Sequence, residues 1–138
     1  YMKNKWNVLR WLFASYYLVA GIGVTLLLIG VFSPSDVPDF GKGINDLLAA
    51  LFSTGFGMGL LAATYTVSGG LLLNNRTAHF GLITLSPVVL VIFLTHCFVE
   101  GGAPVWGAMH LTILLSLAWR YRQAYFPLFD FSGKFQAQ

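Results

Sequence analysis

Two histidines and one cysteine stand inside apolar stretches of this sequence, where ionisable side chains are rare. His96 precedes Cys97, and His110 follows Trp106 by four positions in the next apolar stretch. An imidazole in such surroundings can hydrogen-bond a quinone ring, relay a proton, ligate a metal or haem, or contact a pigment. Alternatively, both histidines are neutral and hydrogen-bond to Thr, Ser or backbone groups of neighbouring helices.

The positions of the two histidines favour a shared pocket. His96 lies near the end of one apolar stretch and His110 near the start of the next, so in antiparallel helices their depths differ by only a few Å at about 1.5 Å per residue. Trp106 and the mid-stretch Tyr65 supply further polar contacts. We predict His96, His110, Trp106 and Tyr65 as residues that bind a quinone- or lipid-like ligand, and we predict neither a catalytic residue nor a metal site.

Several other chemistries are excluded by the residues present. A single cysteine allows neither an internal disulfide nor a self-contained dithiol pair, and Cys97 is predicted to be a small buried apolar residue. The apolar stretches hold no acid to complete a Ser-His-acid set. The chain also contains no GxSxG, no HExxH and no phosphate-binding glycine loop. The chain on its own is therefore not predicted to be a hydrolase.

The composition indicates that lipid, rather than water, surrounds most of this chain. Of the 138 residues, 57% are hydrophobic and only 9% are charged, whereas soluble domains average about 25% charged residues. So few charges cannot cover a soluble domain of this size, so the chain is predicted to be an integral membrane protein. A formal net charge of +3 is too small to indicate a nucleic-acid partner.

The predicted fold is all-α, a polytopic membrane protein with one transmembrane domain over residues 1–138. Glycine pairs and proline-containing loops divide the apolar sequence, and a short interfacial or re-entrant helix is predicted at about 44–54 after the first loop. Pro87 is predicted to leave a free carbonyl near Ile83. Four transmembrane helices are predicted, at about 11–32, 57–74, 79–99 and 105–122.

The charges predict the orientation. Seven of the eight basic residues fall on the side of both termini: Lys3, Lys5, Arg10, Arg76, Arg120, Arg122 and Lys134. Four of the five acids fall on the other side with Lys42: Asp36, Asp39, Asp46 and Glu100. The positive-inside rule then places both termini on the cytoplasmic side of the membrane. Arg10, Arg76, Arg120 and Arg122 are predicted to be topology or headgroup anchors.

The order of these features resembles the DoxX family of small four-helix bacterial membrane proteins. The likeness covers about residues 40–130 and comprises the LLLNNR hinge at Leu71–Arg76, the run SPVVLVIFLTH at Ser86–His96, and the ending WRYRQAYFPLF at Trp119–Phe129. The family often carries a lysine and a glutamate in its second span, where this chain reads Ala-Ala-Thr-Tyr at 62–65.

The resemblance implies a role in a membrane complex, since some members are subunits of a thiosulfate:quinone oxidoreductase. The predicted function is a small accessory or structural subunit of a redox or respiratory-type membrane complex. The alternatives are a quinone-linked oxidoreductase subunit with a quinone- or lipid-binding pocket near His96 and His110, and a small transporter. The predicted partners are the lipid bilayer and other membrane subunits or further copies of the chain.

Overall fold

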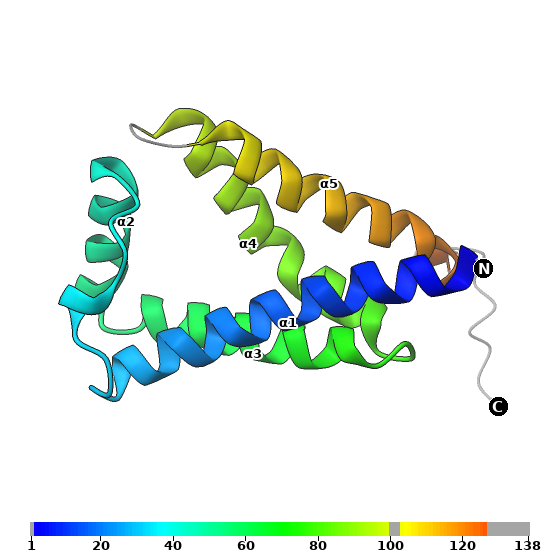
Figure 1. Ribbon diagram of the computed structural model, residues 1–138, viewed down its shortest axis with the longest axis horizontal. Helices are drawn as coiled ribbons and strands as arrows, with labels where there is room; N and C mark the ends of the chain where they lie inside the picture. The colour runs from blue at the N-terminus through cyan, green and yellow to red at the C-terminus, as the bar shows by residue number, and fades with distance from the viewer. Residues whose placement is uncertain (1, 100–102, 127–138) are drawn as a thin grey trace, which may run out of the picture.

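The computed structural model describes residues 2–99 and 103–126, and the regular elements in this part of the chain are all helices (Figure 1). The long helices are α1 (Met2–Leu28), α3 (Gly57–Leu73), α4 (Ala78–Phe98) and α5 (Pro104–Arg120). Shorter elements are η1 (Pro34–Asp36), α2 (Lys42–Ser53) and α6 (Arg122–Tyr125). The all-α prediction is confirmed. Glu100 and Lys134, which entered the charge count above, lie outside the described residues.

Among the described helices, two are long and apolar enough to cross a membrane: the segment Lys5–Leu28 of α1, and α4. Helices α2 and α3 meet the same criterion only as a pair, and they are bent by 102° at the break between them. Helix α5 has 17 residues, about 26 Å at about 1.5 Å per residue, which is shorter than a hydrocarbon core of about 30 Å. The structure therefore supports two membrane spans, or three if the bent pair counts as one, and the predicted fourth span stays a prediction.

The break between α2 and α3 is built by Thr54 and Gly55. Gly55 has a φ of 76°, a left-handed conformation that glycine adopts without strain. The Thr54 hydroxyl donates to the carbonyl of Leu51 at 2.7 Å and accepts from the N–H of Gly57 at 2.9 Å. One side chain thus satisfies backbone groups at the end of one helix and the start of the next, which stabilises the bend.

Close packing between the helices depends on glycine. A Cβ on Gly21 of α1 would lie 2.5 Å from the Thr66 Oγ1, and one on Gly69 of α3 would lie 2.9 Å from the Leu18 backbone N. Only a residue without a side chain lets the two backbones approach so closely. As a result α1 and α3 lie side by side over most of their length (Figure 1).

We call the side-by-side pair of α1 and α3 the first hairpin, although α2 lies between them in the chain. Helices α4 and α5 form the second hairpin, which contacts the first at one end. Gly81 approaches the backbone of α3, and Gly107 of α5 approaches Phe93 of α4. Figure 1 shows that α4 and α5 lie close to α1 and α3 near the N-terminus and diverge from them toward α2. The molecule is therefore two helical hairpins that are packed together at one end and separated at the other.

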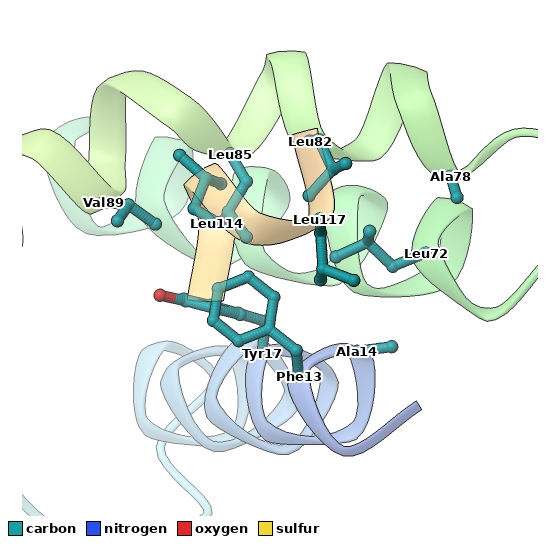
Figure 2. Close-up of a cluster of buried hydrophobic side chains, with 10 residues drawn as sticks. All are labelled: Phe13, Ala14, Tyr17, Leu72, Ala78, Leu82, Leu85, Val89, Leu114 and Leu117. Carbon is teal, nitrogen blue, oxygen red and sulfur yellow. The ribbon is translucent and has the colours of Figure 1, made fainter. Parts of the chain in front are cut away.

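A hydrophobic core fills the end where the hairpins meet. Figure 2 shows its ten buried residues on α1, α3, α4 and α5, with Val89 and Ala78 at the two ends of the cluster. They are Phe13, Ala14, Tyr17, Leu72, Ala78, Leu82, Leu85, Val89, Leu114 and Leu117. Each long helix contributes, so the core ties the two hairpins into one unit.

Pro87 lies inside α4, as its position in the sequence predicts. Proline cannot donate a backbone hydrogen bond, so the carbonyl of Ile83 loses its helical partner. The Ser86 hydroxyl donates to that carbonyl at 2.8 Å. The carbonyl that the sequence predicts to be free is thus satisfied by the residue beside the proline.

Candidate functional site

His110 lies in an aromatic cluster between the two hairpins. Its side chain is only 5% exposed, and its ring centre lies 5.0 Å from that of Tyr16 and 6.0 Å from that of Tyr17. Trp106, one turn earlier on α5, lies at 6.2 Å, and Phe13 lies at 6.3 Å. The site is therefore built by one face of α1, where aromatic residues at 13, 16 and 17 share a side, and by one turn of α5.

Tyr65 joins the cluster through Tyr17. The two tyrosine rings are 5.2 Å apart, and Tyr17 in turn faces His110. The structure thus brings together three of the four predicted ligand residues, Tyr65, Trp106 and His110. The tyrosines of α1 that connect them were not predicted as ligand residues.

The hydrogen bonding of His110 defines its tautomer. Its Nδ1 lies 2.8 Å from the carbonyl oxygen of Trp106, and His96 Nδ1 lies 2.8 Å from the carbonyl oxygen of Ile92. A carbonyl only accepts, so the proton of each neutral ring is on Nδ1. The Nε2 atom of each ring is left as an acceptor, directed away from its own backbone.

The cluster is closed on one side and open on the other. Tyr17 is fully buried, whereas Tyr16 is 52% and Trp106 is 55% exposed, although both rings face His110. In a membrane-spanning chain such exposed rings contact lipid, a ligand or another protein.

His96 occupies a different position from His110. Its side chain packs against Gly107 at the contact of α4 and α5, where a Cβ on that glycine would lie 3.1 Å from the His96 Cβ. It is half-buried, and none of the ring contacts in the described chain joins it to the aromatic cluster. Cys97, beside it, is exposed rather than buried. The structure therefore places His96 beside Gly107 and outside the ring contacts of the aromatic cluster.

A polar cavity lies at the opposite end of the molecule from α2, where α1, the hinge before α4 and the end of α5 meet. Its volume is about 320 Å³. The polar and aromatic residues that line it are Trp6, Asn7, Arg10, Asn75, Arg120 and Tyr121. The Tyr121 hydroxyl donates to the Asn75 Oδ1 at 2.6 Å and ties the end of α5 to the hinge.

The four predicted anchor arginines differ in their surroundings. Arg10 is buried and lines the cavity, and Arg120 lines it from the exposed end of α5. Arg122 donates to the Trp119 carbonyl at 3.3 Å, and its guanidinium lies 4.9 Å from the centre of that indole ring. Arg76 is exposed in the hinge.

Neither the aromatic cluster nor the polar cavity resembles a metal centre. Within residues 2–99 and 103–126, no three His, Cys, Asp or Glu side chains lie close enough together to hold a metal ion. The aromatic cluster can instead stack on and hydrogen-bond a flat polar ring. The cavity is lined by donors and can hold an anion.

Comparison with known proteins finds no match: no family model, no curated protein and no solved structure is similar to this chain. The DoxX resemblance therefore stays a prediction that depends on the sequence motifs. The described residues form an all-helical fold with two helices that can span a membrane, or three spans if the bent pair of α2 and α3 is one of them.

Proposed function

We propose that this chain is a DoxX-like accessory subunit of a larger membrane complex of the redox or respiratory type. In this proposal it crosses the bacterial inner membrane four times, with both termini in the cytoplasm. The sequence motifs between about residues 40 and 130 support the family, and the charge distribution supports the orientation. The surface of α3 supports the role of a subunit.

The observation that carries the proposal is a row of small residues on the outer face of α3. Gly59, Ala63 and Gly70 share one side of the helix, since they are separated by four and seven positions. All three are exposed, and a Cβ on Gly59 or Gly70 would meet nothing within 4 Å. Small residues at this spacing let a second transmembrane helix approach closely, and packing at such contacts drives association in lipid. This face therefore fits a helix of a partner subunit.

Purification in gentle detergent tests the proposal. We expect the wild-type chain to elute with a different membrane protein at constant stoichiometry. The double substitution Gly59→Leu and Gly70→Leu should release that partner, because the added side chains fill the contact face. Ala108→Leu, on an exposed position of α5, is the matched control and should keep the partner. A chain that elutes alone, or only with copies of itself, would contradict the proposal.

A second candidate function is that of a quinone-linked oxidoreductase subunit, and the aromatic cluster favours it. The half-exposed Tyr16 and Trp106 offer flat faces to a ring. The His110 Nε2 can accept a hydrogen bond from a quinol hydroxyl, and the Tyr16 hydroxyl can donate one to a quinone carbonyl. The cluster thus supplies one acceptor and one donor at the edge of an apolar surface.

Quinone content and turnover test this second function. Mass spectrometry of the purified protein should detect quinone, and replacing both His96 and His110 with Phe should abolish quinone-dependent turnover. His110→Phe alone should suffice, because His110 and not His96 lies in the aromatic cluster. Unchanged turnover in the double variant would rule the function out.

A further inference from the structure

Among the described residues, Arg10 is a buried charge with unpartnered guanidinium atoms. Its side chain is only 3% exposed, and its Nε and Nη1 atoms have no hydrogen-bond partner among the described residues. A guanidinium removed from water is strongly unfavourable unless it is paired and hydrogen-bonded. Because Arg10 lines the polar cavity, an anion in that cavity lies beside the guanidinium and can balance its charge.

The remaining polar groups of the cavity are mainly donors. Arg120 adds a second guanidinium, and the Trp6 indole adds one N–H. The Asn75 Oδ1 already accepts from the Tyr121 hydroxyl, so the NH₂ of that amide is the part left to bind a ligand. No Asp or Glu belongs to the lining described here. Such a set of groups fits an oxyanion and disfavours a cation.

The positive charge at this end is not balanced by nearby acids in the described chain. The acids within residues 2–99 and 103–126 are Asp36, Asp39 and Asp46, which lie beyond the far end of α1 and in α2. Lys5 and Arg76 add further positive charge near the cavity end of the molecule. The local potential therefore attracts anions.

The cavity lies near the edge of the apolar segment of α1. The apolar segment of α1 that can cross a membrane starts at Lys5, so Trp6 and Arg10 lie at its edge. Tryptophan and arginine at this level contact lipid headgroups. A volume of about 320 Å³ lies at the lower end of the range of about 300–1,000 Å³ for small-molecule sites, which is more room than a single ion requires.

We infer that the cavity between Arg10 and Arg120 binds a phosphate group. The planar guanidinium forks match the paired oxygens of a phosphate, and the hydrogen bonds are charge-assisted. The phosphate belongs either to the headgroup of an anionic lipid at the membrane edge or to a free phosphate from the aqueous side. This inference is independent of the proposed function, because it concerns a different site and a different ligand.

Lipid binding by the full-length chain tests the inference. The protein is purified in mild detergent, delipidated, and titrated with phosphatidylglycerol or phosphatidylcholine while bound lipid is counted by native mass spectrometry. We expect one phosphatidylglycerol per chain, with an affinity at least tenfold higher than for phosphatidylcholine. Arg10→Gln should remove this preference.

A second titration identifies the source of the phosphate. Inorganic phosphate is added to the delipidated protein, with chloride at equal ionic strength as the control, and the Tm is measured. A Tm rise with phosphate that is lost in Arg10→Gln assigns the site to free phosphate, whereas a response to phosphatidylglycerol alone assigns it to lipid. Equal affinity for both lipids together with no response to phosphate would overturn the inference.

Two further variants separate the site from general surface charge. Arg120→Gln changes an exposed residue, so it should fold normally and weaken binding several-fold even if Arg10→Gln fails to fold. Arg76→Gln removes an exposed arginine near the same end that does not line the cavity, and it should leave binding unchanged. Equal losses in Arg76→Gln and Arg120→Gln would overturn the inference, since diffuse charge would then explain the binding.

A final variant tests an internal partner for Arg10. Asp130 lies outside the described residues, and Asp130→Asn removes its carboxylate. We expect the lipid or phosphate preference to be unchanged in this variant. A preference that is absent in the wild type and present only in Asp130→Asn would show that the carboxylate neutralises Arg10, which would overturn the inference.

Discussion

At the scale of single residues, the buried polar groups of this protein fall into two kinds. His96 and His110 each donate to a carbonyl one turn earlier on their own helix, so their Nδ1 protons are satisfied. The Tyr17 hydroxyl and the Ser68 hydroxyl are buried with no hydrogen-bond partner among the described residues. Groups of the second kind destabilise the fold unless another molecule satisfies them.

Tyr17→Phe tests whether the buried Tyr17 hydroxyl has a hydrogen-bond partner. If the hydroxyl has no partner, removing it relieves a desolvation penalty, and the free energy of unfolding should rise by about 1 kcal/mol. Unfolding by titration with a denaturing detergent, followed by circular dichroism, measures this change. Tyr17→Leu is the control and should lower stability, since it also removes the ring that packs on Phe13 at 4.9 Å. A loss of stability in Tyr17→Phe would instead show that the hydroxyl has a hydrogen-bond partner.

At the scale of the helices, the contact of α1 with α3 depends on the absence of a side chain at Gly21. Gly21→Val would force the Thr66 backbone and hydroxyl away, and overpacking of this kind costs about 1–3 kcal/mol. Gly23→Val is a matched control on the same helix, because a Cβ there meets nothing within 4 Å. We expect the first variant to lower the unfolding midpoint in the same detergent titration and the second to change it little. Equal effects would show that helix propensity, rather than packing, determines the result.

Helix α2 has the sequence of an interfacial helix. Its apolar residues Ile44, Leu47, Leu48, Leu51 and Phe52 share one face. The bend of 102° from α3 lays α2 roughly along the membrane surface if α3 crosses the membrane.

Spin labels on α2 measure this placement. In a Cys97→Ser background reconstituted in vesicles, a label at Leu47→Cys should relax mainly with oxygen dissolved in lipid. A label at Asp46→Cys, on the other face, should relax mainly with a water-soluble nickel chelate. If both labels respond alike to the chelate, α2 does not lie on the bilayer.

At the scale of the whole molecule, the sequence predicts the helical class, the break near Gly55 and the hinge before α4, because composition, glycine and charge act locally. It does not predict which helix faces meet. Helices α3 and α4 are apolar on every side, so they lack the periodic pattern that reveals a buried face. The polar cavity also escapes prediction, because Arg10, Asn75 and Arg120 are far apart in the chain and meet only after the hairpins pack.

The separation of charge along the molecule leads to a prediction about its orientation. In the described chain, the acids lie in the first loop and α2, and the basic residues other than Lys42 lie at the end with Arg10 and Arg120. The positive-inside rule places the basic end in the cytoplasm.

Single cysteines at Ser35 and Gln123, in a Cys97→Ser background, should therefore differ in labelling by a membrane-impermeant thiol reagent. Ser35→Cys should react in intact spheroplasts, whereas Gln123→Cys should react only after the membrane is permeabilised. Reaction of both cysteines in sealed spheroplasts would place the two positions on the same side and would contradict the predicted arrangement of spans.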